Sequence, residues 1–438
     1  MAGGVWSMQN KVRPGSYINF KGESLSADGG GTRGIVSLPL LLSWGASKQI
    51  VTIESEAEAS KKLGYPLTAP QLLAVKEVLK RAKTLLLYRL NVGTKATATA
   101  GGITLSAKYG GVRGNALAVK ITANVDEPGT FDVSTILEGI EVDRQNVVNI
   151  AGLKGNNWVE FSGTGALVAS AGIPLVGGTD GVTTAQDYLD YLAVVEVQDV
   201  NTIGLMVTDA ATKEVFASFC RRQRESEGKK VQVVMENYPT ADYEGVISVK
   251  NGVVLSDGSI LTAAQSVAWV AGATASAAMN KSLTYDAYDG AVDVTPKYTN
   301  SQIETALKNG EFVFTGVAGR AVVEQDINSL HTFSPQKGKG FAKNRVLRVL
   351  DGINNDFGRI FRDFYLGKVS NNDDGRNLLK SEYVTYLKNL QNIEAIQNFD
   401  LQKDIKVAPG DGIDAVISEV YVQPVDSMEK LYMTIAVG

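Results

Sequence analysis

The chain has 438 residues, of which 44% are hydrophobic and 21% are charged. These values are typical of soluble globular proteins, and the length predicts about three domains. The formal net charge is −4, and the chain has no dense basic face interleaved with aromatic residues, which argues against a nucleic-acid ligand. Its start lacks the basic and apolar regions of a signal peptide, and its apolar runs are too short to cross a bilayer. We therefore expect synthesis in the cytoplasm and no direct membrane insertion.

The chain contains one cysteine, Cys220, and one histidine, His331. A disulfide requires two thiols, and typical zinc sites and nucleophile–base pairs use several Cys and His residues. Cys220 ends an apolar helical stretch, where burial is the usual state of a cysteine, and His331 lies near a predicted loop. We therefore expect no catalytic, cofactor or metal site.

The first predicted element is an extended N-terminal arm. Ser16, Ile18 and Phe20 alternate with Tyr17 and Asn19, which is the period of a β-strand. A Gly-rich stretch follows the arm.

Helical and strand patterns then alternate along the chain. Apolar residues recur at three- and four-residue intervals behind a proline and predict a helix over residues 67–87. Thr184 and Asp187 are spaced as the N-cap and reach-back residues of a second helix. Residues 203–235 read as strand, helix and strand, which predicts a sheet with helical cover.

Residues 95–176 differ in character, because they are rich in Gly, Thr, Ala, Val and Asn and contain short alternating runs. Short strands at close spacing with glycine turns predict an all-β unit inserted into the α/β body. Such a unit has its own core and closely spaced ends, so its excision is expected to leave the body folded.

The second half of the chain begins with a predicted hairpin. Asn251 and Gly252 separate two β-like runs and suit a type I′ turn. A small-residue helix over residues 261–278 and a strand pair near residues 312–323 follow. Two helices with long apolar stripes are then separated by the polar loop 370–375.

Together these patterns predict an α/β, or mixed α+β, multidomain fold. It consists of a helix-covered mixed sheet body, an inserted all-β domain and extended terminal arms. The expected boundaries are 1–24 for the N-terminal arm, 25–94 and 177–310 for the body, 95–176 for the insertion, 311–414 for a C-terminal α+β domain and 415–438 for the C-terminal arm.

The C-terminal arm ends in a strand pattern without an evident partner. Apolar and other side chains alternate from Lys430 to Val437, after a first β-like run over residues 415–423. The candidate arm-contact residues are Val420 and Val422 in the first run and Leu431, Met433, Ile435 and Val437, which share one face, in the second. The pattern leaves two alternatives open: pairing within the same domain, or coverage by a partner.

Three glycine-rich segments, near residues 29–34, 110–115 and 338–340, lack the spacing and context of a phosphate-binding loop. They are better explained as turns. Asp286, Asp289 and Asp293 lack calcium-loop spacing and are also assigned to a turn.

A basic stretch is the one local excess of charge. It comprises Lys337, Lys339, Lys343, Arg345 and Arg348. Solvent exposure at a helix start explains it most simply, but cations oppose the dipole at that end, which favours an anionic partner surface.

Several short segments, taken in order, carry a resemblance to a known family. They are PGSYI at 14–18, YGGVRGNAL at 109–117, LVGGTDG at 175–181, AWVAG at 268–272, VEQDINSL at 323–330 and the helix 345–366. Their number and order resemble the sheath protein of contractile tails, found in myophages and phage-tail-like bacteriocins, over nearly the whole chain.

The resemblance implies a structural subunit of a helical homo-oligomer of stacked rings around an inner tail tube protein. Baseplate and tail terminator proteins would be further partners, and the bacterial cell would release the assembled particle. It also implies that the arms exchange strands between subunits, that the insertion lies outside and that the basic stretch contacts the tube. Glycines near both arms, namely Gly22, Gly29, Gly30, Gly31, Gly410 and Gly412, are expected to act as hinges during contraction.

Two other classes of protein are alternatives to a sheath subunit. An α/β nucleotide-binding enzyme would need a phosphate-binding turn or a clustered acid–base set, and a β-rich surface adhesin would need an export signal. The sequence does not separate a phage from a bacteriocin origin.

Overall fold

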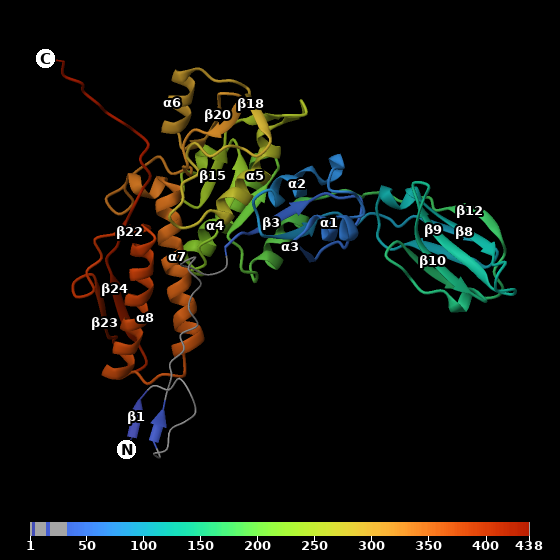
Figure 1. Cartoon of the computed structure of the whole chain (residues 1–438), viewed down its shortest axis with the longest axis horizontal. Coiled ribbons are helices and arrows are strands. Elements are labelled where there is room, and N and C mark those ends of the chain that lie inside the picture. The colour runs from blue at the N-terminus through green and yellow to red at the C-terminus, as the bar shows by residue number, and fades with distance from the viewer. Residues whose placement is uncertain (1, 5–14, 18–32, 438) are drawn as a thin grey trace. The chain divides into compact units, whose positions relative to one another are not determined.

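The computed structural model describes residues 2–4, 15–17 and 33–437, and their contacts divide the chain into two units (Figure 1). The larger unit comprises residues 33–277 and 282–347. The smaller unit comprises residues 278–281 and 348–437 together with the short N-terminal strands.

A seven-stranded sheet forms the centre of the larger unit, in the order β19-β15-β14-β13-β3-β5-β4. The strands are β3 (Ile35–Leu40), β4 (Ile50–Ile53), β5 (Thr84–Arg89), β13 (Thr202–Leu205), β14 (Gln232–Glu236), β15 (Val246–Val249) and β19 (Glu311–Phe312). All neighbours are parallel except β4, which pairs antiparallel with β5 at one edge. Parallel strands buried on both faces are mostly apolar, and these strands also bury a few polar residues, namely Ser37, Thr202, Gln232, Ser248 and Glu311.

Helices cover both faces of this sheet. They are α1 (Glu56–Leu63), η1 (Pro70–Leu72), α2 (Leu73–Leu79), α3 (Ala185–Val195), α4 (Ala210–Glu225) and α5 (Ala263–Ser276). Side chains of α2 and α5 share one apolar core with the sheet, and those of α3 and α4 share another. Adjacent residues of one strand, such as Val233 and Val234, belong to opposite cores because side chains alternate along a strand.

The expected helix over residues 67–87 is wrong in its second half. The helix ends at Leu79, and residues 84–89 form β5, which is a central strand. The run Leu85, Leu86 and Leu87 matched a helical stripe because a strand buried on both faces has no alternation that would distinguish it.

The expected hairpin at Asn251 and Gly252 is also wrong. β15 belongs to the large sheet, whereas β16 (Gly252–Leu255) pairs with β17 (Ile260–Leu261) and β18 (Ala291–Thr295) in a separate sheet. Asn251 is buried, and its side chain bonds both the backbone N–H and the carbonyl of Phe314. At position 252, a Cβ atom would lie 1.8 Å from the carbonyl oxygen of Leu261, so glycine is needed for close approach.

The larger unit also contains α6 (Asn300–Lys308), β20 (Phe314–Val317), β21 (Arg320–Val323) and the short helices η4 (Pro239–Ala241) and η5 (Lys339–Ala342). β20 and β21 form a hairpin, as the sequence predicts. The expected capping box at Thr184 and Asp187 is likewise confirmed at the start of α3.

A β-sandwich is inserted between β5 and α3. Its strands are β6 (Thr97–Ala100), β7 (Ile103–Ala107), β8 (Leu117–Ala123), β9 (Phe131–Leu137), β10 (Ile140–Val147), β11 (Val159–Gly163) and β12 (Ser170–Pro174), with short helices η2 (Val112–Ala116) and η3 (Ile150–Gly152). One sheet has the order β10-β9-β8-β12 and the other β11-β7-β6. Their inward side chains form a separate apolar core.

The smaller unit is built on two long helices. Its elements are α7 (Asn344–Ile360), of which residues 348–360 belong to this unit, the π-helical turn η6 (Phe361–Tyr365), α8 (Asp373–Asn392), β22 (Ile396–Gln397), β23 (Ile405–Pro409), β24 (Val416–Val420) and β25 (Gln423–Pro424), with β1 (Ala2–Gly4) and β2 (Gly15–Tyr17). Stacked rings of Phe357 and Tyr383 join the two helices, at a centroid distance of 3.8 Å.

The predicted fold class, a mixed α+β multidomain protein with an all-β insertion, is confirmed. The boundary expected at residue 311 differs from the structure, because β19 completes the edge of the large sheet and the larger unit extends to Leu347. None of the helices in the described ranges is long and apolar enough to cross a membrane.

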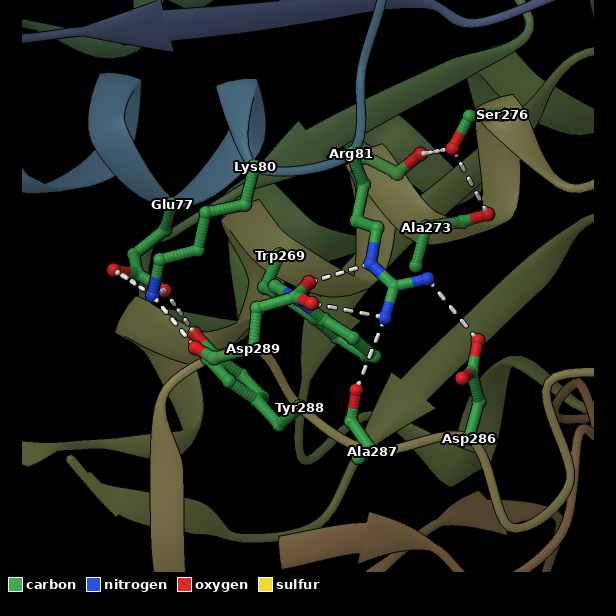
Figure 2. Close-up of polar contacts among 11 residues, drawn as sticks. Glu77, Lys80, Arg81, Trp269, Ala273, Ser276, Asp286, Ala287, Tyr288 and Asp289 are labelled. Carbon is green, nitrogen blue, oxygen red and sulfur yellow. Dashed lines mark hydrogen bonds and ion pairs between the residues drawn. The ribbon is translucent and has the colours of Figure 1, made fainter. Parts of the chain in front are cut away.

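A polar network beside α2 ties distant segments of the body together (Figure 2). Arg81 donates to both carboxylate oxygens of Asp289, to Asp286 and to the carbonyl of Ala287. The indole N–H of Trp269, from α5, also donates to Asp289 at 2.8 Å. The acidic turn expected from sequence is therefore an arginine-binding loop.

We expect Asp289→Asn to lower the free energy of unfolding by about 1 kcal/mol at pH 7, since the ion pair is partly exposed. Burial alone would raise the pKa of Asp289, but hydrogen bonds from Arg81 and Trp269 outweigh it and lower this pKa. The contribution is therefore complete above the ordinary aspartate pKa of about 3.9 and disappears as the pH falls through the lowered value. Urea denaturation at pH 7 and pH 3 measures this loss.

Glu304→Gln is the matched control, because Glu304 and Lys308 are both more than 70% exposed. A parent-like stability of Asp289→Asn at pH 7 would contradict the role assigned to this network.

Candidate assembly surfaces

The end of the chain presents an unpaired apolar face. Beyond β25, residues 426–437 belong to no strand in the described part of the chain, and Figure 1 shows them as an extended trace. Leu431, Met433, Ile435 and Val437 are 84%, 69%, 73% and 92% exposed. Exposed alternating apolar residues in an extended segment suit pairing with the edge of another sheet.

The first part of the expected arm is placed differently. β24 pairs antiparallel with β23 of the same chain, which sets Val420 opposite Ile405. Val420 and Val422 are half-buried against the core of the smaller unit. The free segment therefore begins after β25, about ten residues later than the sequence predicts, because β23 supplies a local partner that the sequence pattern did not reveal.

The small sheets of this unit have only two strands each. β22 pairs with β25, and β23 pairs with β24. An isolated two-stranded pair is marginally stable unless it packs on another element, and β23 packs against α8. Such pairs leave strand edges to which a further strand can be added.

The N-terminal arm is described only in part. β1 and β2 pair in parallel, and Tyr17 is the last residue of β2. Ile18, Phe20, Gly22, Gly29, Gly30 and Gly31 lie outside the described residues.

The two C-terminal glycines expected as hinges lie in the loop between β23 and β24. The Gly410 N–H donates to the carbonyl of Ala415, which closes the loop. A Cβ atom at Gly412 would lie 2.7 Å from the Asp414 carboxylate. Gly410 and Gly412 therefore serve a hairpin within the smaller unit rather than a junction with the free segment.

The cations of the basic stretch differ in their burial and in their contacts. In the larger unit, the Lys337 ammonium lies 2.6 Å from the buried Glu244 carboxylate and over the Tyr243 ring. In the smaller unit, Arg348 is 2% exposed and donates to the carbonyl of Lys281 at 2.6 Å. Arg348 is therefore not available as a surface contact, which corrects the sequence interpretation.

The other three basic residues differ in exposure. Lys339 is exposed in the short helix η5 (Lys339–Ala342), and Lys343 and Arg345 are half-buried. Lys339 is thus the most accessible cation of the five.

Cys220 and His331, for which the sequence predicts no catalytic role, each contact a backbone carbonyl. Cys220 is fully buried in α4, and its thiol contacts the carbonyl of Gly245 at 3.3 Å. The Nδ1 atom of His331 lies 2.9 Å from the carbonyl oxygen of Ser329. Among the described residues, no group of three or more His, Cys, Asp or Glu side chains is arranged to hold a metal ion.

Sequence comparison identifies the family. Family models match the chain as the phage tail sheath protein central domain over residues 181–329, and its C-terminal domain over residues 336–438. The domain III N-terminal region matches residues 33–90, and the β-sandwich domain matches residues 91–180. The chain therefore belongs to the phage tail sheath protein family, and the resemblance found in the sequence is confirmed.

Individual proteins agree with this assignment. The phage-like element PBSX protein XkdK of Bacillus subtilis is 39% identical over the full length of both chains. The sheath tail protein of Desulfitobacterium hafniense is 59% identical, with a TM-score of 0.87 over 96% of this chain and 99% of that one. The sheath tail protein of Listeria innocua is 44% identical, with a TM-score of 0.82 over 92% and 95%.

A more distant neighbour shares the fold alone. It is the helical sheath of the anti-feeding prophage in its contracted state, with a TM-score of 0.58 and 12% identity over 97% of this chain and 98% of that one.

We expect Arg348→Met to lower the free energy of unfolding much more than Lys339→Glu does, because Arg348 is buried and Lys339 is exposed. Arg348→Met removes a buried hydrogen bond to a carbonyl and should lower the free energy of unfolding by about 2 kcal/mol. Lys339→Glu changes an exposed side chain and should alter it by less than about 0.5 kcal/mol. Denaturant unfolding of both variants measures the difference, and equal losses would show that the assigned burial is incorrect.

Proposed function

We propose that this chain polymerises as a helical sheath of stacked rings around an inner tail tube protein. Contraction of the sheath then drives the tube through the envelope of a target cell. Strand exchange through the terminal arms links the subunits. The observation that carries this proposal is the exposed alternating apolar face of residues 431–437, combined with the membership of the sheath family.

The energetics of one arm explain how free subunits remain separate. Burial of four apolar side chains contributes roughly 6–12 kcal/mol, at about 1.5–3 kcal/mol each. Ordering eight residues costs roughly 8–16 kcal/mol, at about 1–2 kcal/mol each. A single arm is therefore near balance, and the multivalency of a lattice decides the outcome.

The strand acceptor is proposed to be an open edge of the small sheets in a neighbour's smaller unit. β23–β24 and β22–β25 each have two strands, so an added strand would extend a sheet already supported by α8.

The tube contact is proposed at the exposed Lys339, with the half-buried Lys343 and Arg345 beside it in sequence. These residues suit an acidic surface on the tube. A baseplate and a tail terminator would complete the particle, which the producing cell would release.

Contraction is proposed to run on free energy stored at assembly, without catalysis. The extended lattice would be a kinetically trapped state, and the contracted lattice would be more stable. The described residues contain no phosphate-binding turn of the kind that an ATPase or GTPase uses.

Deletion of residues 427–438 should give a folded, soluble subunit that does not polymerise, because the described residues of this segment form no strand and most of its apolar side chains are exposed. Negative-stain microscopy and sedimentation detect tubes or their absence. Tubes formed by the truncated chain would disprove strand exchange at this end, and an insoluble product would assign the segment to its own domain.

A matched pair of point variants refines this test. Ile435→Lys places a charge on the apolar face, whereas Thr434→Lys places the same charge on the alternate face. We expect only Ile435→Lys to abolish assembly, since a half-buried strand tolerates charge on its outer face.

Isolated tails should contract on mild acid or denaturant treatment with ATP and GTP absent and a chelator present. The contracted state should then resist re-extension, because it is the more stable state. Electron microscopy measures the fraction contracted, and a strict requirement for nucleotide or metal would contradict stored free energy as the source.

A further inference from the structure

A buried polar joint connects the β-sandwich to the carboxyl ends of β3 and β5. Arg89, at the end of β5, is fully buried. Its Nη1 atom donates to the carbonyl of Gly45 at 2.8 Å, and its Nη2 atom donates to the carbonyl of Gly110 at 2.7 Å. Gly45 lies in the body and Gly110 lies between β7 and β8 of the sandwich, so one guanidinium bridges the two.

Asp180 adds further contacts to this joint from the segment that connects β12 of the sandwich to α3 of the body. Its carboxylate accepts a hydrogen bond from the Ser43 hydroxyl at 2.9 Å and from the backbone N–H of Val112 at 2.8 Å. The Asn91 amide donates to the Asp180 carbonyl and exchanges two hydrogen bonds with the backbone of Leu42. The side chains of Asp180 and Asn91 thus add hydrogen bonds to the contact between the body and the sandwich.

Apolar packing surrounds these contacts. Trp44, from the body, is 1% exposed and lies against two sandwich rings, Tyr109 at 5.4 Å and Trp158 at 5.3 Å between centroids. At Gly111, which has φ of 139°, a Cβ atom would lie 2.0 Å from the carbonyl oxygen of Ser43. The backbones therefore approach so closely that only glycine fits.

Arg113 supplies a second cationic contact across the joint. Its Nε atom donates to the carbonyl of Gly64 at 2.9 Å, and its guanidinium stacks on the Tyr65 ring at 4.2 Å. Arg113 lies in η2 of the sandwich, whereas Gly64 and Tyr65 follow α1 of the body.

We propose that these contacts form a lock that holds the β-sandwich and the α/β body as one rigid body. The lock comprises Ser43, Trp44, Arg89, Asn91, Arg113 and Asp180. The sandwich then does not swing on its two connections, and it is carried with the body whenever the body moves. That consequence for contraction rests on the proposed function, whereas the lock itself does not.

The buried charge of Arg89 explains why the sandwich is expected to keep one orientation relative to the body. Burial lowers the pKa of Arg89 to about 10, so the guanidinium remains protonated at neutral pH. A buried cation bound to two carbonyls loses those partners if the sandwich rotates, which disfavours intermediate orientations. Excision of the sandwich would also expose Trp44 and remove the Gly110 carbonyl, so the body is expected to lose stability, contrary to the sequence interpretation.

Double electron–electron resonance on the unassembled full-length chain tests the lock. Spin labels at Ala57→Cys in α1 and Val125→Cys in the sandwich report the orientation, and the buried Cys220 is protected from labelling. We expect one narrow distance distribution in the labelled chain. Asp180→Ala should broaden it and speed protease cleavage within residues 93–96 and 176–183 by about tenfold, as the joint opens more often.

Ser43→Ala, which removes one hydrogen bond, should act in the same direction to a smaller extent. If Asp180→Ala does not fold, Ser43→Ala alone decides the outcome. Glu141→Gln is the control, because it removes an exposed ion pair with Arg144 that lies outside both cleavage segments and should change neither readout. A broad distribution in the labelled chain, or parent-like behaviour in the lock variants, would overturn the proposal, and neither measurement depends on sheath assembly.

Discussion

The body depends on the burial of α5 against the large sheet. Residues 266–275 of this helix are all buried, so it has no solvent face. It contacts β3, β13, β14 and β15 on one side and α2 on another. Small residues permit this approach: a Cβ atom at Gly272 would lie 2.7 Å from the carbonyl oxygen of Val78. The parallel strands can be mostly apolar because α5 and α2 cover one face, while α3 and α4 cover the other.

At the carboxyl edge of the same sheet, the described segments make contacts with the inserted sandwich. In open parallel α/β sheets, ligands bind beyond the carboxyl ends of the strands, where the strand order reverses. Here β3 neighbours both β13 and β5, and the segments that leave β3 and β5 carry Trp44 and Arg89 into the joint with the sandwich. At this edge the guanidinium of Arg89 therefore bonds backbone carbonyls of both the body and the sandwich.

The sequence predicted the elements whose patterns are local. The capping box at Thr184, the helix in residues 210–225, the hairpin of β20 and β21 and the all-β character of the insertion all depend on neighbouring residues. Errors arose where tertiary burial removed the pattern. β5 resembled helix because it is buried on both faces, and Asn251 with Gly252 served contacts to Phe314 and Leu261 rather than a turn.

At the assembly surfaces, too, the sequence predicted features that depend on neighbouring residues and missed those that depend on tertiary contacts. Alternation over residues 430–437 indicated an exposed apolar strand pattern, which needs only local sequence. The burial of Arg348 and the pairing of Lys337 with Glu244 could not be predicted, because Lys281 and Glu244 are distant in sequence. The lock was missed for this reason as well, since Ser43, Arg89 and Asp180 follow no common period.

The two units therefore differ in how completely their own elements cover their sheets and apolar side chains. The larger unit closes its sheet with helices on both faces and fixes its inserted sandwich through buried charge and aromatic packing. The smaller unit has sheets of two strands and ends in an apolar segment that none of its described elements covers. Backbone groups at an open strand edge and exposed apolar side chains are each stabilised by added strands. Under the proposed strand exchange, a neighbouring subunit would supply the added strand that this smaller unit lacks.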